Sequence, residues 1–184
     1  MTNASVLASR MVRTNEPTGE ILWHVEQRGS GPDIVLVPSG EGDCSSFEMV
    51  AQALVADYRV TTFDTPGFSR SITSGDVEIS IPALAGQITR LIRALGIERA
   101  TFYGCSSAGV AALELAADHA PLVHRAVVHE AALPEARGGP STRIYSRSRA
   151  AARRRSPRTT SSGARAWSSF ARSFRPPGQS GWSA

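Results

Sequence analysis

The 184-residue sequence contains no lysine, and its last 48 residues contain neither aspartate nor glutamate. Residues 1–136 hold 9 arginines and all 16 acidic residues, which gives a net charge of −7. Residues 137–184 hold 11 arginines and therefore carry a net charge of +11. The formal charge of +4 averages two unlike segments, so each segment needs its own interpretation.

Cysteines and long apolar runs are also scarce. The two cysteines, Cys44 and Cys105, are too few for a disulfide scaffold and are typical of reduced thiols. No apolar run approaches the ~18 residues of a membrane-spanning helix. The first ten residues lack the charged and apolar regions of a secretory signal. These absences predict a cytoplasmic protein without a membrane partner.

The arginine-rich segment 137–184 lacks leucine, valine and methionine as well as acids. Because no part of it can cover a hydrophobic core, we expect it to be disordered. Its composition is also that of a GC-rich gene read out of frame. A genuine basic tail is the alternative, in which RRRSPR (153–158) would bind nucleic acid or another polyanion. No RNA-binding signature accompanies it, which makes a nucleic-acid partner the weaker interpretation.

Residues 9–136, between an N-terminal extension (1–8) and the tail, alternate between short apolar runs and amphipathic segments. Strands are expected at 9–15, 20–28, 33–38, 58–64, 99–104 and 125–130. Helical spacing runs over 47–55, 81–95 and 107–118. Ser45 with Glu48 has the pattern of a capping box, and Ser80 that of an N-cap. The alternation predicts an α/β fold: a mostly parallel sheet of about six strands with flanking helices.

The stretch TFYGCSSAGVAALE (101–114) joins an expected strand to an expected helix. Gly104, Ser106 and Ala108 have the spacing of the G-x-S-x-G pattern, which exposes a serine nucleophile on a strained turn. A frame centred on Ser107 fits less well, because Cys105 would then replace the first glycine. A serine hydroxyl needs a base and an oxyanion site to react. A serine-rich helix cap is the alternative interpretation of the same residues.

Four stretches together resemble the α/β-hydrolase superfamily and, within it, the zearalenone lactonases, which open the macrocyclic ester of a fungal toxin. These are GPDIVLVPSGEGDC (31–44), RVTTFDTPGFSRS (59–71), GCSSA (104–108) and HE (129–130). The resemblance covers about residues 10–135. It implies a serine hydrolase of the ester or lactone type that acts on a small molecule without a metal or cofactor.

The same resemblance implies a role for each of four residues. Ser106 is the expected nucleophile, and Glu130 is the expected acid of the triad, which orients a histidine. The backbone N–H groups of Gly40 and Ser107 are expected to form the oxyanion hole. The resemblance also implies eight strands. The six expected in this chain would follow the order 1-2-4-3-5-6, with the sixth at an exposed edge.

A histidine in the right place is missing from this pattern. His24, His119, His124 and His129 all precede Glu130, whereas the superfamily has the order serine, acid, histidine. His129 adjoins Glu130 on one expected strand, where neighbouring side chains point to opposite faces. We therefore predict a truncated or frameshifted hydrolase without its general base. Two alternatives stay open: a non-catalytic α/β module with a polyanion-binding tail, and a haloperoxidase-like or dehalogenating enzyme.

Overall fold

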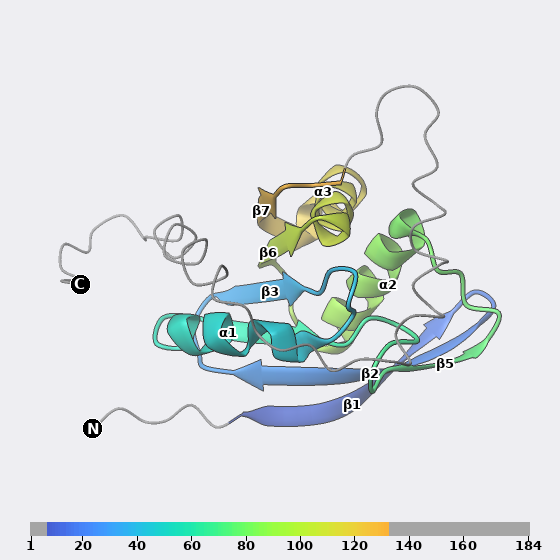
Figure 1. The fold of residues 1–184 in the computed structure, drawn as a ribbon, viewed down its shortest axis with the longest axis horizontal. Helices are drawn as coiled ribbons and strands as arrows, with labels where there is room; N and C mark the ends of the chain where they lie inside the picture. Colours follow the sequence, from blue (N-terminus) through green and yellow to red (C-terminus); the bar gives the residue numbers. More distant parts are fainter. Residues whose placement is uncertain (1–6, 133–184) are drawn as a thin grey trace. The chain divides into compact units, whose positions relative to one another are not determined.

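The computed structural model describes residues 7–132, which form a mixed β-sheet with helices on both faces (Figure 1). The predicted tail 137–184 and most of the predicted N-terminal extension lie outside these residues. The strands are β1 (Ala8–Glu16), β2 (Gly19–Arg28), β3 (Asp33–Val37), β4 (Arg59–Phe63), β5 (Ile72–Gly75), β6 (Ala100–Cys105) and β7 (Val123–His129). The helices are α1 (Glu48–Leu54), α2 (Ile81–Ala94) and α3 (Ser107–Asp118), with short 3₁₀ turns η1 (Cys44–Phe47) and η2 (Ala120–Leu122).

The strand order along the sheet is β1-β2-β4-β3-β6-β7. The hairpin β1–β2 is antiparallel, and β2 pairs antiparallel with β4. From β4 onward the pairs β4–β3, β3–β6 and β6–β7 are all parallel. This arrangement confirms the predicted α/β class and the predicted order of its six strands. It also brings the carboxyl ends of β3, β4, β6 and β7 to one edge, where open parallel sheets bind ligands.

The described residues contain a seventh strand, β5, in a stretch where the sequence pattern predicts no strand. The first half of β2 pairs with β5 through Gly19–Leu22, and its second half pairs with β4 through Val25–Arg28. The prediction failed because β5 is four residues long and its single large apolar side chain, Ile72, is 60% exposed. Pairing with a long neighbour forms this strand, and its own sequence pattern gives no signal for it.

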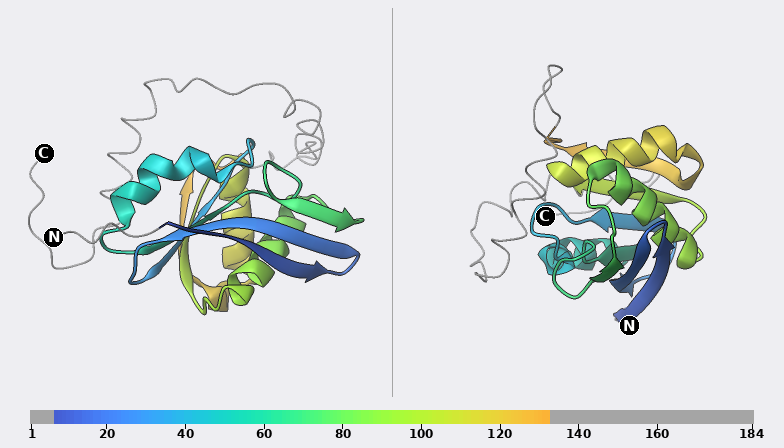
Figure 2. Two further views of the ribbon diagram at one scale, coloured as in Figure 1. Left: turned by 90° about the horizontal axis from the view of Figure 1, so that it is seen from below. Right: turned by 90° about the vertical axis from the view of Figure 1, so that its right-hand side faces the viewer.

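The helices cover the two faces unequally: α2 and α3 pack together on one face, and α1 lies on the other (Figure 2). Ser80 caps α2 as predicted, because its side chain accepts a hydrogen bond from the N–H of Ala83. The predicted capping box of Ser45 and Glu48 is wrong. Asp43 accepts the Ser45 N–H at 2.8 Å and caps η1, while the Glu48 carboxylate pairs with Arg28.

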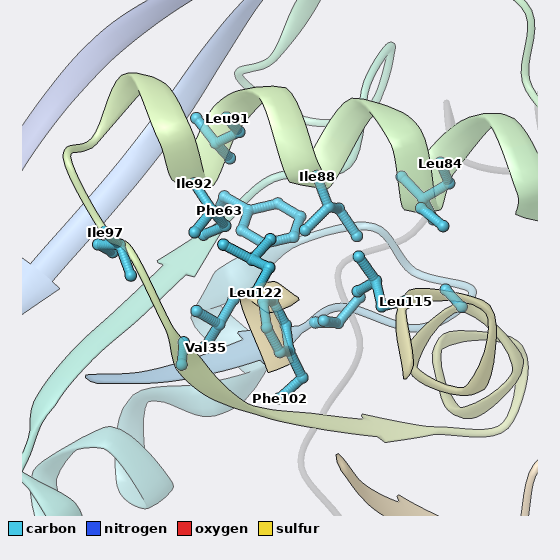
Figure 3. Close-up of a cluster of buried hydrophobic side chains, with 14 of the residues drawn as sticks. Val35, Phe63, Leu84, Ile88, Leu91, Ile92, Ile97, Phe102, Leu115 and Leu122 are labelled. Carbon is cyan, nitrogen blue, oxygen red and sulfur yellow. The ribbon is translucent and has the colours of Figure 1, made fainter. Parts of the chain in front are cut away.

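The main hydrophobic core fills the space between the sheet and the pair α2–α3 (Figure 3). Trp23 and Phe63 are fully buried and meet edge to face at a centroid distance of 5.4 Å. The indole N–H of Trp23 donates to the hydroxyl of Thr14 at 2.8 Å, so its polar atom is satisfied inside the core. The apolar stripe of α2 completes the layer, as its helical spacing predicts.

Strand β7 forms one edge of the sheet among the described residues, and its side chains are half-buried or exposed. Its only recorded strand partner in that part of the chain is β6. Among residues 7–132, the last strand therefore lies at the edge of the sheet where the sequence predicts it. No helix within residues 7–132 is long and apolar enough to cross a bilayer.

Candidate active site

Ser106 occupies the sharp turn between β6 and α3. Its backbone has φ = +53° and ψ = −123°, a region that non-glycine residues rarely adopt, and the residue is exposed. Strand and helix approach so closely at this turn that a Cβ on Gly104 would lie 2.1 Å from the carbonyl oxygen of Ala108. The turn therefore has the strained geometry and the small flanking residue that the G-x-S-x-G pattern predicts.

Backbone hydrogen bonds tie this turn to the end of β7. The Ser106 N–H donates to the carbonyl of His129 at 3.1 Å, and the Ser106 carbonyl accepts from the N–H of Ala132 at 3.1 Å. Glu130 lies between these two partners, directly after β7, with φ = +46° and an exposed side chain. The structure thus places Ser106 and Glu130 at neighbouring strand ends.

The loop after β3 brings Gly40 to the same edge of the sheet. A turn closes where the Gly42 N–H donates to the carbonyl of Ser39 at 2.9 Å, and Gly40 lies within it. The hydroxyl oxygens of Ser39 and Ser107 are 3.4 Å apart, so the loop meets the first residue of α3. A Cβ on Gly40 would have no neighbour within 4 Å, which leaves open space beside its backbone. Gly40 and Ser107 therefore lie on two segments that contact each other, the loop after β3 and the start of α3.

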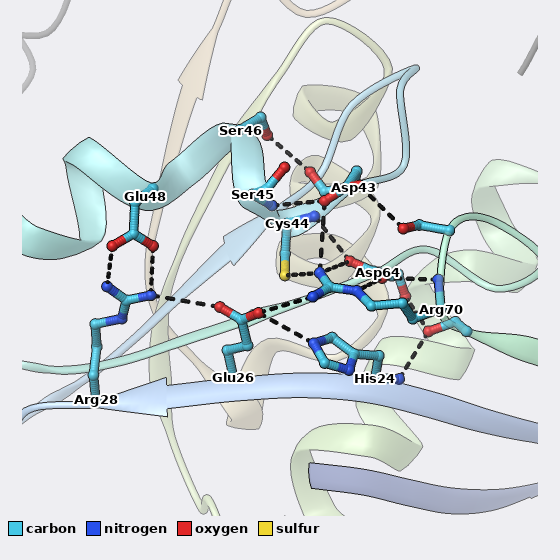
Figure 4. A network of polar contacts seen from close by, with 12 residues as sticks. His24, Glu26, Arg28, Asp43, Cys44, Ser45, Ser46, Glu48, Asp64 and Arg70 are labelled. Atoms are coloured by element: carbon cyan, nitrogen blue, oxygen red, sulfur yellow. Dashed lines mark hydrogen bonds and ion pairs between the residues drawn. The ribbon is translucent and has the colours of Figure 1, made fainter. Parts of the chain in front are cut away.

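An ion pair between buried Asp64 and half-exposed Arg70 contacts Asp43 and Cys44, which follow the Gly40 turn in the sequence (Figure 4). Asp64, directly after β4, is fully buried, and its carboxylate accepts hydrogen bonds from the Arg70 guanidinium and from the N–H groups of Cys44 and Arg70. Burial alone would raise the pKa of Asp64, but these donors outweigh it and lower the pKa to about 2. The Asp64 contacts hold the Arg70 guanidinium charged and raise its pKa.

Glu26 extends the polar network along β2. Its carboxylate contacts Nε2 of His24 at 3.1 Å, Arg70 at 3.2 Å and Arg28 at 3.4 Å. Arg28 in turn makes a bidentate pair with Glu48 on α1, with both distances 2.7 Å. The sequence pattern of residues 59–71, which contain Asp64 and Arg70, contributed only to the resemblance to the α/β-hydrolases. It did not predict that these two residues form an ion-pair network. An acid six residues before an arginine, just after a buried strand, was the available signal.

Within residues 7–132, two groups of side chains have ligand atoms close enough for a metal ion: His24, Glu26 and Cys44, and Asp43, Cys44 and Asp64. The Arg70 guanidinium occupies the second group, with Nη2 3.2 Å from the Cys44 sulfur and 3.0 Å from Asp64. Burial and the nearby Asp64 raise the pKa of Cys44 to about 12, whereas metal binding needs a thiolate. These donors fit an ion-pair network better than a metal site.

The four histidines occupy different parts of the fold. His24 is buried on β2, which β4 and β3 separate from β6, and His119 caps the end of α3. His124 and His129 lie on β7 and are exposed. The objection to His129 from strand alternation does not hold, because β7 ends at His129 and Glu130 has a left-handed backbone. No hydrogen bond joins the His129 ring to Ser106 or to any other described residue.

A mixed sheet whose parallel strand β6 ends in a strained serine turn is typical of hydrolase-type α/β folds. The α/β-hydrolase fold family matches residues 32–176, and the chain belongs to this family. The match runs past the boundary at residue 136 that the composition predicts, into residues beyond the described part. The family assignment confirms the resemblance that the sequence motifs indicate.

Zearalenone hydrolases are among the curated relatives. The one from Bionectria ochroleuca is 40% identical over 118 residues, which are 62% of this chain and 44% of that protein. The one from Cladophialophora bantiana is 38% identical over 114 residues, 60% of this chain and 43% of that protein. The chain therefore spans less than half the length of the curated relatives it matches.

Solved structures show the same fold at lower identity. A protein from Acinetobacter baumannii AYE that has been proposed to be a lipase matches with a TM-score of 0.65 and 23% identity, over 74% of this chain and 46% of that one. A membrane phospholipase A matches with a TM-score of 0.62 and 23% identity, over 70% and 42%. At this identity the comparison establishes the architecture alone.

Proposed function

We propose that residues 7–132 carry the nucleophile, the acid and the oxyanion hole of a serine hydrolase for esters or lactones. The observation that carries the proposal is the strained backbone of Ser106 at the β6–α3 turn, where Gly104 leaves no room for a side chain. The hydrogen bonds on either side of Glu130 support its role as the acid. The contact of Ser39 with Ser107 supports a shared oxyanion site.

In this mechanism the Ser106 hydroxyl attacks the ester carbonyl and gives up its proton to a base. The carbonyl oxygen becomes an oxyanion, which the N–H groups of Gly40 and Ser107 stabilise. Collapse expels the alcohol and leaves an acyl-serine, which water then hydrolyses. In a lactone the expelled alcohol stays on the same molecule, so one product results. Glu130 would orient the imidazole that shuttles the proton and would stabilise its cation.

The proposed substrate is a macrocyclic lactone of the zearalenone type. Its support is the pair of relatives named zearalenone hydrolase, at 40% and 38% identity. The described residues supply the reacting centre, whereas the part of the relatives beyond the aligned region has no counterpart among them. The preference for this lactone over simple esters therefore rests on the relatives.

We further propose that the 184-residue chain lacks the general base. The support is that every histidine precedes Glu130 in the sequence. If the arginine-rich segment arises from a frameshift, the gene read in its other frames from about codon 134 should encode a hydrolase segment with a late histidine.

The test uses a completed hybrid, in which residues 1–132 of this chain are joined to the part of the Bionectria ochroleuca zearalenone hydrolase that follows the aligned region. We expect the hybrid to hydrolyse zearalenone and p-nitrophenyl acetate, and the 184-residue chain to hydrolyse neither detectably. Ser106→Ala should abolish turnover by the hybrid, and Glu130→Gln should lower kcat by about 10²-fold or more. The control is Ser74→Ala, an exposed serine on β5, which should leave turnover unchanged.

His129 is the second candidate for the base, because β7 ends at this residue and frees it from strand alternation. If the 184-residue chain itself turns over ester in a Ser106-dependent manner, His129→Ala should remove that activity. Such a result would contradict the proposal of a missing base. Turnover by the hybrid that survives Ser106→Ala would contradict the proposed nucleophile.

A further inference from the structure

The loop that carries Gly40 is held in place by the segment that follows β4. Within the loop, the Ser39–Gly42 hydrogen bond closes the turn around Gly40. The Gly42 carbonyl then accepts the N–H of Thr65 at 2.8 Å. The ring of Phe68 covers Gly42, since a Cβ there would lie 2.5 Å from that ring. Movement of the segment after β4 would therefore move the turn that contains Gly40.

Side chains from the same segment hold the residues just after the turn. The Asp64 carboxylate accepts the Cys44 N–H at 2.9 Å, and Nη2 of Arg70 contacts the Cys44 sulfur at 3.2 Å. Arg70 also lies 3.6 Å from the Asp43 carboxylate, which the Ser69 hydroxyl reaches at 3.0 Å. Both residues that follow Gly42 are thus fixed by polar contacts.

The Arg70 guanidinium makes two of these contacts, with the Cys44 sulfur and the Asp43 carboxylate. Arg70 donates through Nε and Nη2 to the two oxygens of Asp64 at 2.8 and 3.0 Å, which fixes the plane of its fork. In that orientation the same group faces Asp43, Cys44 and Glu26. A lysine would keep the positive charge but would not reproduce this geometry, because an ammonium group is a point charge on a flexible stem.

We propose that Asp64 and Arg70 are positioning residues that hold the N–H of Gly40 in its oxyanion-binding position. The inference rests on the proposed function of Gly40. Neither residue needs to touch the substrate, because the path to Gly40 runs through Cys44, Gly42 and the closed turn. Loosening the pair should therefore impair the transition state more than substrate binding.

A second arginine–aspartate pair, between β3 and β4, provides a matched control. Arg59 at the start of β4 makes a bidentate pair with Asp33 at the start of β3, at 2.6 and 2.7 Å. The side chains of Arg59 and Arg70 are equally exposed, at 42% and 43%. The two pairs differ in position, because the Arg59 pair lies at the opposite end of these strands from the Gly40 loop. Arg59→Lys removes a comparable fork without touching that loop.

The first measurement is alkylation of Cys44 by iodoacetamide in the 184-residue chain, followed peptide by peptide with Cys105 as the internal reference. Cys44 is buried and should react slowly. Arg70→Lys and Asp64→Asn should each accelerate alkylation of Cys44 about tenfold or more by local opening, and hydrogen exchange at residues 39–42 should rise with it. Arg59→Lys should change neither rate by more than about twofold. Equal rates in Arg70→Lys and the unmodified chain would overturn the inference.

The second measurement is steady-state kinetics of the completed hybrid. Loss of one oxyanion donor lowers kcat by about 10²–10³, so a displaced Gly40 N–H should lower it at least about tenfold while KM changes little. Arg59→Lys should leave both constants unchanged. A normal kcat in Arg70→Lys, with Ser106→Ala inactive, overturns this inference and leaves the proposed function standing. If turnover is unchanged in Ser106→Ala, the proposed function is overturned, and with it the oxyanion-binding role of Gly40.

Discussion

Two glycine-to-alanine substitutions add the same methyl group to this chain and should change its stability in opposite directions. At Gly104 the new Cβ would lie 2.1 Å from the oxygen and 2.5 Å from the carbon of the Ala108 carbonyl, and 2.9 Å from the nitrogen of Gly109. All three atoms belong to the backbone at the start of α3, so no side chain can rotate away. Relief requires α3 to move off the sheet.

At Gly86, inside α2, the new Cβ would meet only the end of the Arg90 guanidinium at 3.6 Å, an ordinary contact with a flexible group. Over-packing of a well-packed site costs typically 1–3 kcal/mol, and we place Gly104→Ala at about 3 kcal/mol because the clash is with backbone. Gly86→Ala should stabilise by about 0.5–1 kcal/mol, since alanine loses less backbone entropy in a helix.

Urea unfolding of the 184-residue chain, followed by far-ultraviolet circular dichroism, measures both effects. With a urea dependence of ~1–3 kcal/mol per molar, Gly104→Ala should lower the midpoint by at least about 1 M, and Gly86→Ala should raise it by a few tenths. A Gly104→Ala variant as stable as the unmodified chain would refute the close approach of β6 and α3. It would also remove the structural basis for the strained turn at Ser106.

Three further outcomes can be measured on the same chain. Because the pKa of Asp64 falls from 3.8 to about 2 on folding, its carboxylate stabilises the fold above pH 4, and this contribution of about 2 kcal/mol should disappear as the pH falls from 4 to 2. In Asp64→Asn, the free energy of unfolding should depend less on pH between pH 4 and pH 2. An unchanged pH dependence in that range would contradict the lowered pKa of Asp64. Thr14→Val should cost about 1–2 kcal/mol by leaving the Trp23 N–H unpaired, whereas Thr65→Val, whose buried hydroxyl has no hydrogen-bond partner among the described residues, should be neutral or stabilising; urea midpoints that shift alike would refute this contrast. Strand β7, which lies at the sheet edge among the described residues, should make the 184-residue chain less soluble on expression than the completed hybrid, and equal yields of monodisperse monomer would count against that expectation.

Much of this fold is predictable because its central strands, β3, β4 and β6, are buried on both faces. Runs such as DIVLV at β3 give an unmistakable signal, and the apolar stripe of α2 defines its helix from Ser80 onward. The order of the six predicted strands agrees with the observed sheet because it came from the family resemblance. Strand β5 escaped notice, since its pairing with β2 is a tertiary effect that its four residues do not encode.

The candidate site also has a part that the sequence predicts and a part that it does not. The positions of Ser106 and Gly104 follow from a local rule, because a strand-to-helix turn needs small neighbours wherever it occurs. The Asp64–Arg70 pair depends on how the loops after β3 and β4 meet, and a single sequence does not show that. The predicted cap of the helical segment is also wrong. Asp43 caps it in place of Ser45, because η1 begins at Cys44, before the helix that the hydrophobic spacing predicts.

The backbone at the end of β7 restricts where a general base could come from. Ser106 donates its N–H to the residue before Glu130 and accepts one from the residue two positions after it. These hydrogen bonds hold the backbone of Glu130 beside Ser106, so the proposed acid needs no further element to bring it near the proposed nucleophile. The imidazole has no such anchor in the described residues: His24 is engaged with Glu26, and His129 uses its carbonyl, not its ring, to hold Ser106. A base for Ser106 therefore requires either rotation of the His129 ring toward the turn or a histidine from a segment that follows β7, and the hybrid compared with the His129→Ala chain separates these two cases.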